Sequence, residues 1–140
     1  MTAICVDASF IIRLVTQPSG TSTYLSLWEQ WLANDAEIIA PSLLYYEVSN
    51  GLYKYVVANM TTLEESTQFL QAALTLPITL YHDASLYQKG HSLADELNLP
   101  ATYDAHYLAL SEHLNAEFWT CDRRLYNTVR SRLHWVHLAN

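Results

Sequence analysis

Short apolar runs alternate along this chain with longer segments in which apolar residues recur every three or four positions. The short runs have the length of buried strands, and the longer segments have the period of helices with one apolar face. Strands are predicted at residues 3–6, 37–40, 78–81, 117–121 and 135–138. Helices are predicted at 9–16, 23–34, 42–60, 62–76, 83–97, 103–114 and 123–133.

Two local signals mark where predicted helices begin. Pro41 precedes the third helix, and proline is favoured in a first helical turn, so we expect Pro41 to open that helix. Thr62 and Glu65 have the spacing of a capping box, which predicts the start of the fourth helix.

The alternation of strands and helices is typical of parallel βαβ units. It predicts an α/β protein, a three-layer α/β/α sandwich with about five mostly parallel strands and about seven helices. The chain has 140 residues and shows no linker or internal repeat, so we expect a single domain over residues 1–140. The order of the strands stays open at this point.

Composition narrows the class of protein. Apolar residues make up 51% of the chain and charged residues 15%, as in a folded globular protein. No apolar run reaches the ~18 residues that span a bilayer, and no signal peptide is evident, so we expect a cytoplasmic protein without a membrane partner. Cys5 and Cys121 are then expected to be reduced core thiols.

The net charge of −7 argues against a nucleic-acid partner, because phosphate contacts need Lys and Arg. Its distribution qualifies this conclusion. Four of the seven basic residues lie in one short C-terminal stretch, at Arg123, Arg124, Arg130 and Arg132. Cations bound by some of the acids would also offset the formal sum.

Four acids stand next to apolar segments. Asp7 directly follows the first predicted strand, and Asp122 directly follows the fourth. Asp104 lies in the first turn of the helix before that fourth strand, and Glu47 lies among apolar residues of the helix after the second. Ligands of such folds bind beyond the carboxyl ends of the strands, so these acids are expected to converge there. Converging carboxylates repel one another, and a Mg²⁺ or Mn²⁺ ion relieves that repulsion.

Each acid also has a simpler interpretation. Asp7 and Asp122 each precede a predicted helix, where an aspartate commonly serves as the N-cap. A single Asp or Glu is most often a cap or a solvated surface group. The metal site is favoured because all four acids occur together and in order.

The stretches VDAS, YEVSNGL, YDAHYLALS and TCDRRL follow one another in the order and spacing of the motifs of PIN-domain ribonucleases. The chain most closely resembles the VapC-type toxins of type II toxin–antitoxin pairs, over essentially its whole length. This resemblance implies an acidic pocket, dependence on Mg²⁺ or Mn²⁺, and endonucleolytic cleavage of RNA. It also implies a homodimer and a tight complex with a cognate antitoxin that places a basic residue near the carboxylates.

Carried over by motif, the acids of the expected pocket are Asp7, Glu47, Asp104 and Asp122. Asp7 and Asp104 are the expected direct metal ligands, and Asp122 would complete the metal site directly or through water. Glu47 would be a further ligand or would orient the attacking water.

Four more residues extend this expected site. Ser9 and Thr120 would hold carboxylates or waters by hydrogen bonds. Arg123 and Arg124 directly follow the last acid and would contact RNA phosphate, although they also fit a solvated helix face. Which RNA is cut stays open.

Two other functions remain as alternatives. A phosphatase with an aspartate nucleophile also carries an acid after its first strand, but it usually has a second Asp two residues later, where this chain has Ser9. A non-catalytic PIN-like scaffold would bind protein partners without cutting RNA. The presence of all four acids gives that alternative no support.

Overall fold

The computed structural model describes residues 2–18, 20 and 22–140. In this part of the chain, the strands are β1 (Ala3–Val6), β2 (Glu37–Pro41), β3 (Thr79–Tyr81), β4 (Glu117–Thr120) and β5 (Val136–Leu138). The helices are α1 (Ala8–Thr16), α2 (Thr23–Ala33), α3 (Leu44–Val57), α4 (Leu63–Leu74), α5 (Ala84–Glu96), α6 (Tyr103–His113) and α7 (Arg123–Val129).

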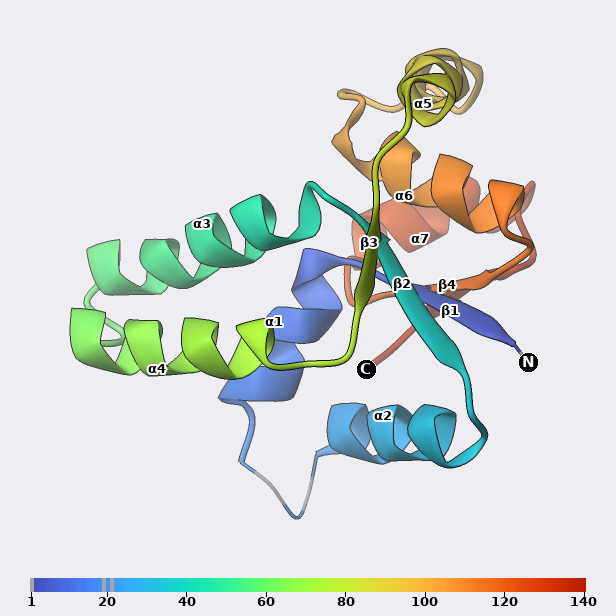
Figure 1. The fold of residues 1–140 in the computed structure, drawn as a ribbon. Helices are drawn as coiled ribbons and strands as arrows, with labels where there is room; N and C mark the ends of the chain where they lie inside the picture. Colours follow the sequence, from blue (N-terminus) through green and yellow to red (C-terminus); the bar gives the residue numbers. More distant parts are fainter. Residues whose placement is uncertain (1, 19, 21) are drawn as a thin grey trace.

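The strands form one parallel sheet in the order β3-β2-β1-β4-β5. From β1 the chain builds outward through β2 to β3, then crosses to β4 and continues to β5. Helices α1 and α2 lie on one face of the sheet, and α6, α7 and the overlying α5 lie on the other (Figure 1). The predicted three-layer α/β architecture is therefore confirmed, and the strand order reverses between β1 and β4.

Most predicted elements occur within two or three residues of their expected bounds, but the role given to Pro41 was wrong. Pro41 is the last residue of β2, and α3 begins at Leu44. The strand persists because Pro41 still pairs with Tyr81 of β3, and the Ser42 N–H donates to the Tyr81 carbonyl at 3.0 Å. A proline is tolerated at a strand end, where its missing N–H is not needed by the ladder.

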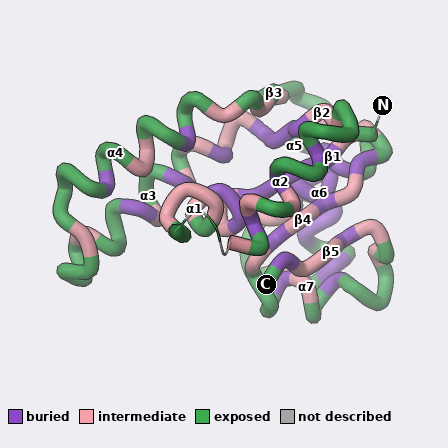
Figure 2. Tube along the Cα trace, turned by 90° about the horizontal axis from the view of Figure 1, so that it is seen from below, coloured by how far each residue is buried: buried purple, intermediate pink, exposed green. Residues whose placement is uncertain are grey.

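The sequence signal at the start of α4 was correct. Thr62 and Glu65 form the predicted capping box: the Glu65 N–H donates to Thr62 Oγ1, and the Thr62 N–H donates to the Glu65 carboxylate. Helices α3 and α4 pack against each other and against α1, and they project beyond the sheet as an arm (Figure 1). Much of this arm is exposed, whereas the strands are largely buried (Figure 2).

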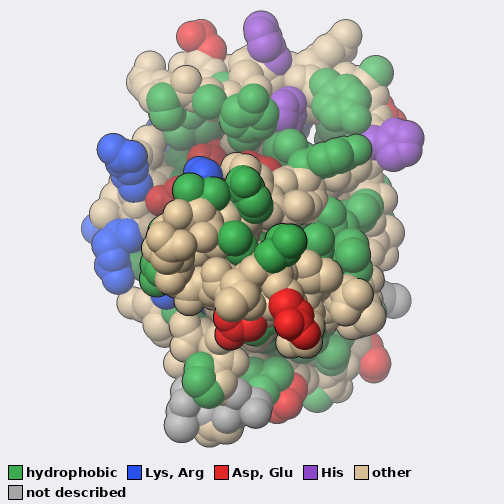
Figure 3. Space-filling view, turned by 90° about the vertical axis from the view of Figure 1, so that its left-hand side faces the viewer, with side chains coloured by type: hydrophobic (Ala, Val, Ile, Leu, Met, Phe, Trp, Pro, Cys, Tyr) green, Lys and Arg blue, Asp and Glu red, His purple; other side chains and the backbone are tan. Residues whose placement is uncertain are grey.

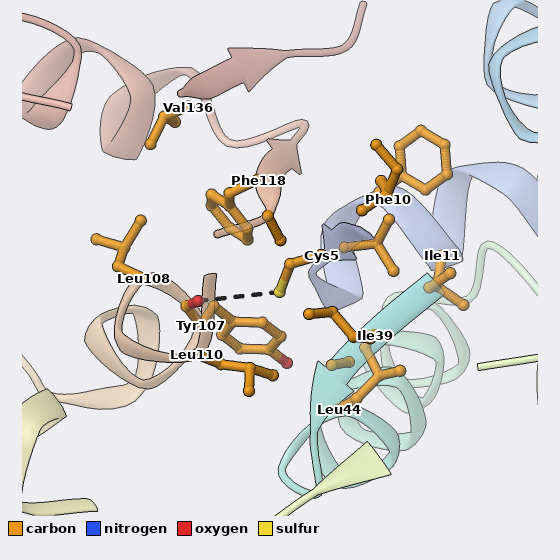
Figure 4. Packing of buried hydrophobic residues seen from close by; sticks show 14 of the residues in the cluster. Cys5, Phe10, Ile11, Ile39, Leu44, Tyr107, Leu108, Leu110, Phe118 and Val136 are labelled. Atoms are coloured by element: carbon orange, nitrogen blue, oxygen red, sulfur yellow. Dashed lines mark hydrogen bonds between the residues drawn. The ribbon is translucent and has the colours of Figure 1, made fainter. Parts of the chain in front are cut away.

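The core lies between the sheet and its two helical layers. Tyr107 of α6 is fully buried, and its ring centroid lies 6.0 Å from that of Phe118 in β4. Figure 4 shows the Tyr107 ring among Cys5, Ile39 and Leu110. Cys5 is buried and Cys121 half-buried, and both are free thiols, as expected. Among the described residues, no helix is long and apolar enough to cross a membrane.

Candidate functional site

The carboxyl ends of β1 and β4 lie side by side at the point where the strand order reverses. Val6 of β1 is in register with Trp119 of β4. The residues that follow these two strands therefore meet at one edge of the sheet, which is where ligands bind in open α/β folds. Asp7 comes directly after β1, while Thr120 ends β4 and Asp122 follows two residues later.

Hydrogen bonds from both strand ends hold the Asp7 carboxylate. Asp7 Oδ1 accepts from Ser9 Oγ at 2.6 Å and from the Phe10 N–H at 3.1 Å. Asp7 Oδ2 accepts from Thr120 Oγ1 at 2.5 Å. The side chain is only 5% exposed, so these bonds fix its position at the bottom of the site.

Ser9 and Thr120 also connect the two loops that follow β1 and β4. Ser9 Oγ accepts a hydrogen bond from the Cys121 N–H at 2.9 Å, and Thr120 Oγ1 accepts from the Asp122 N–H at 3.0 Å. Each of these two hydroxyl groups thus donates a hydrogen bond to the Asp7 carboxylate. Each also accepts a hydrogen bond from a backbone N–H of the segment that follows β4. Ser9 and Thr120 therefore hold the Asp7 carboxylate by hydrogen bonds, as the sequence led us to expect.

Burial raises the pKa of Asp7 from 3.8 to about 6. The hydrogen bonds from Ser9, Thr120 and Phe10 act in the opposite direction, and the nearby charge of Asp104 adds to the increase. A buried carboxylate without a cationic partner is expected to behave in this way.

Asp104 lies in the first turn of α6, and its charge interacts with Asp7. Its pKa is also raised from 3.8 to about 6, first by burial and then by the charges of Asp122 and Glu47. Asp104 in turn acts on Asp7. Asp104 therefore lies near enough to interact with each of the other three acids that the sequence predicted, although 115 positions separate Asp7 from Asp122.

Asp7 and Asp122 are also helix caps. Asp7 Oδ1 accepts from Phe10 at the start of α1, and Asp122 Oδ1 accepts from the N–H groups of Arg124 and Leu125 at the start of α7. The simpler interpretation of these acids is thus correct, yet it does not exclude the site. One carboxylate oxygen of Asp122 caps the helix, and the exposed side chain retains a second.

Glu47 is held by a residue that the sequence analysis did not select. Tyr107 Oη donates to Glu47 Oε1 at 2.7 Å, from α6 to the first turn of α3. Burial raises the pKa of the Tyr107 hydroxyl above its usual range, and the charge of Glu47 adds to this effect. A weak sequence signal was present, because Tyr107 stands three positions after Asp104 and therefore lies on the same side of the helix.

The arginines that follow Asp122 lie at the rim. Arg123 and Arg124 are exposed in the first turn of α7. Among the described residues, no salt bridge joins any of the four acids to a basic side chain. In Figure 3 one group of acidic side chains lies recessed between hydrophobic ones with a basic side chain beside it, other acidic side chains are exposed, and further Lys and Arg side chains lie along one edge of this face.

The donor set of the site suits a hard divalent cation, because all four groups offer carboxylate oxygens. Two of these carboxyl groups have raised pKa values, which a bound cation would lower again. Within the described part of the chain, no group of three His, Cys, Asp or Glu side chains is already close enough to surround one ion. Mg²⁺ typically combines one or two carboxylates with several waters, so a looser cluster fits this ion.

Comparison with known proteins identifies the family. The sequence profile of the PIN domain matches residues 4–130, and the chain therefore belongs to the PIN domain family. The fold is similar to the crystal structure of PAE2754 from Pyrobaculum aerophilum, with a TM-score of 0.66 and 22% identity over 91% of this chain and 86% of that one.

A second solved structure has the same fold. VapC20 of Mycobacterium tuberculosis, described as a Sarcin-Ricin loop cleaving toxin, has a TM-score of 0.56 and 13% identity, over 84% of this chain and 86% of that one. A search of curated proteins found no significant match. PIN domains are generally nucleases that use divalent metal ions, so membership of the family supports a nuclease role for this chain.

Proposed function

We propose that this protein is a metal-dependent endoribonuclease and the toxin of a type II toxin–antitoxin pair. One observation carries the proposal: Asp104 interacts electrostatically with each of Asp7, Asp122 and Glu47, and in the described residues no salt bridge joins these acids to a cationic side chain. Like charges held together in this way favour the binding of a cation.

Asp7 and Asp104 would hold a Mg²⁺ or Mn²⁺ ion, and Asp122 would complete the site directly or through water. A bound divalent ion supplies charge neutralisation at the scissile phosphate and a more acidic water. Asp104 and Asp122 offer the more accessible oxygens, whereas Asp7 is 5% exposed and would act from the bottom of the site.

Glu47 would serve as a further ligand or orient the attacking water. The hydrogen bond from Tyr107 engages Glu47 Oε1, so Oε2 would be the oxygen that binds the metal or the water. Ser9 and Thr120 hold Asp7 and the loop of Asp122, and thereby fix the spacing of the carboxylates. Arg123 and Arg124 would contact RNA phosphates from the rim.

The wider biological assignment rests on the family resemblance. VapC20 is described as a toxin that cleaves the Sarcin-Ricin loop, which supports RNA as the substrate class here. We further propose that residues 1–140 form one domain, that the protein is a cytoplasmic homodimer, and that a cognate antitoxin inhibits it. An acidic site in a chain of net charge −7 would attract a basic segment of such an antitoxin.

The environment of Asp7 weighs against the phosphatase alternative. A nucleophilic aspartate needs an oxygen that reaches the substrate phosphorus atom. Ser9 stands where such phosphatases carry their second Asp, and its hydroxyl is bonded to Asp7 Oδ1, with Thr120 Oγ1 bonded to Asp7 Oδ2. A carboxylate in this position is better suited to organising a site than to attacking a phosphate.

Cleavage of a structured RNA tests the proposal. Purified protein is incubated with the RNA in Mg²⁺, in Mn²⁺ and in EDTA, beside Asp104→Asn and the exposed control Glu29→Gln. We expect cleavage in either metal, none in EDTA, at least a 100-fold loss in Asp104→Asn, and no change in Glu29→Gln, given the typical weight of one catalytic group (roughly 10²–10⁴-fold). Equal cleavage by Asp104→Asn and the parent would contradict the proposal.

A second assay addresses the toxin assignment. The protein is mixed with the product of the neighbouring gene, and complex formation and RNA cleavage are measured together. We expect a stable complex in which cleavage is lost. The absence of both complex and inhibition would end the toxin–antitoxin assignment and leave the nuclease proposal standing.

A further inference from the structure

An aromatic pocket lies beside the acidic site. This hollow of about 250 Å³ is formed where the start of α3 meets α5 and α6, and Pro41, Leu43, Tyr46, Tyr87, Tyr103 and His106 line it. Its three tyrosines come from three different helices. They are 78%, 50% and 58% exposed for Tyr46, Tyr87 and Tyr103, so large aromatic surface is accessible to a ligand here.

The pocket and the acidic site share the first turns of two helices. Tyr46 directly precedes Glu47 in α3, and Tyr103 directly precedes Asp104 in α6. The charge of Glu47 also acts on His106, one of the lining residues. A ligand group in the pocket would therefore be close to a phosphate held at the carboxylates.

One wall of the pocket is fixed by close packing of α5 on α6. A Cβ atom on Gly90 would come within 2.4 Å of His106 Nδ1, so the absence of a side chain at Gly90 allows the imidazole ring to lie against α5. The ring of Tyr87 meets this imidazole edge to face, with centroids 6.0 Å apart and an interplanar angle of 88°. Tyr87 thus presents an aromatic surface in a defined orientation, rather than as a freely rotating side chain.

The charge of the protein limits how it can bind RNA. With 14 acidic and only 7 basic residues, phosphate contacts alone give little affinity. Stacking of bases on aromatic side chains is the other general source of affinity, and proteins use it on unpaired bases in loops and single strands. The volume is below the range of about 300–1,000 Å³ typical of pockets for drug-sized ligands, and it suits one flat ring system.

We propose that this pocket binds one unpaired nucleobase of the RNA substrate, next to the scissile phosphate, by stacking against its tyrosines. The inference rests on the proposed ribonuclease function and adds to it the part of the substrate that is recognised. It predicts cleavage at a fixed distance from a splayed-out base in a loop or single strand.

Equilibrium binding and cleavage test the pocket separately. Binding of fluorescein-labelled single-stranded RNA hexamers to the Asp7→Asn protein is followed by fluorescence anisotropy, with an abasic nucleotide placed at each position in turn. The same series is measured with Tyr103→Leu and Tyr103→Phe added. Tyr53→Leu is the matched control, because Tyr53 of α3 is 56% exposed, close to the 58% of Tyr103, but does not line the pocket.

Loss of one stacked base typically weakens binding roughly 5- to 150-fold. We expect a loss in this range at one abasic position, a similar loss in Tyr103→Leu, and no further loss when the two are combined. Tyr103→Phe is expected to retain binding because it keeps the aromatic ring, and Tyr53→Leu should bind as the parent does.

The outcomes separate the two proposals. Equal binding of all abasic hexamers, or additive losses, would overturn the pocket assignment even if the parent protein cleaves the intact hexamers. No measurable binding of any hexamer would overturn it as well. Binding that depends on Tyr103 and on one base, without cleavage of these hexamers by the parent in Mg²⁺, would support the pocket and contradict the ribonuclease proposal.

Discussion

Replacing Asp7 by asparagine should make the metal-free protein more stable while abolishing cleavage. Asp7 is nearly inaccessible, and its pKa is raised from 3.8 to about 6 because burial disfavours the charged form. A folded-state pKa about two units higher means that ionised Asp7 opposes folding by about 3 kcal/mol at pH 8. The variant removes this charge.

The hydrogen bonds around position 7 reduce the gain in stability expected for Asp7→Asn. Asparagine Oδ1 still accepts from Ser9 and Phe10, but its amide group faces Thr120 Oγ1, where the carboxylate accepts. The Thr120 hydroxyl must then rotate, and this offsets about 1 kcal/mol of the stability gained by removing the charge. The expected net gain at pH 8 is about 2 kcal/mol, or roughly 7 °C in the melting temperature of a chain of this length.

The sign of the pH dependence provides the sharper test. The destabilisation by Asp7 is absent below its unfolded pKa of 3.8, develops as the pH rises, and is complete above about pH 6. The stability difference between Asp7→Asn and the parent should therefore be small or slightly negative at pH 4 and positive at pH 8. Asp104 titrates in both proteins, so its contribution to stability largely cancels when the two proteins are compared.

Urea unfolding of both proteins in EDTA, followed by circular dichroism from pH 4 to pH 8, measures this difference. Glu29→Gln is the control, since Glu29 is an exposed carboxylate in the middle of α2. An Asp7→Asn protein that is less stable than the parent at pH 8, or a difference that does not change with pH, would refute this explanation of the site.

Four further variants separate the structural and functional roles of individual residues. Asp122→Ala should lose about 1 kcal/mol of stability with the N-cap of α7, whereas Asp122→Asn should keep the cap in a thermal melt and yet lose cleavage. Tyr107→Phe, which removes the donor to half-buried Glu47, should lose about 1 kcal/mol and lower kcat more than it changes KM. The double variant Arg123→Gln/Arg124→Gln should reduce the slope of log Kd against log salt by about 0.7 for each lost phosphate contact.

Much of the fold was accessible from the sequence because its strands are buried on both faces. Continuous apolar runs such as residues 3–6 distinguish such strands from the amphipathic helices between them. The third strand differs because it is not buried on both faces: Thr79 and Leu80 are exposed. The apolar residue Ile78 precedes this strand and lies outside it. The strand order was not accessible, because it depends on which side of β1 the later strands join.

The misassigned Pro41 illustrates a limit of local rules. Proline favours both a first helical turn and a strand end, and the sequence around Pro41 does not distinguish the two. The pairing of Pro41 with Tyr81 decides between them, and that contact joins residues 40 positions apart.

In the candidate site, too, some features could be predicted from the sequence and others could not. Asp7 and Asp122 each follow a predicted strand, so they were expected to lie close together if those strands were neighbours, and the structure shows that β1 and β4 are neighbours. The bond from Tyr107 to Glu47 was not predicted, because a tyrosine in an apolar helix is ordinarily part of the core. Here the ring does pack in the core, and only its hydroxyl reaches the site.

Titration of Mn²⁺ into the metal-free protein by calorimetry tests the central claim most directly, because it asks whether the gathered carboxylates bind a divalent cation. We expect saturable Mn²⁺ binding by the parent and by Glu29→Gln, and at least a tenfold weaker binding by Asp104→Asn, consistent with the ~10–100-fold losses typical at metal sites. Equal Mn²⁺ binding by Asp104→Asn and the parent, or no binding by the parent, would contradict it.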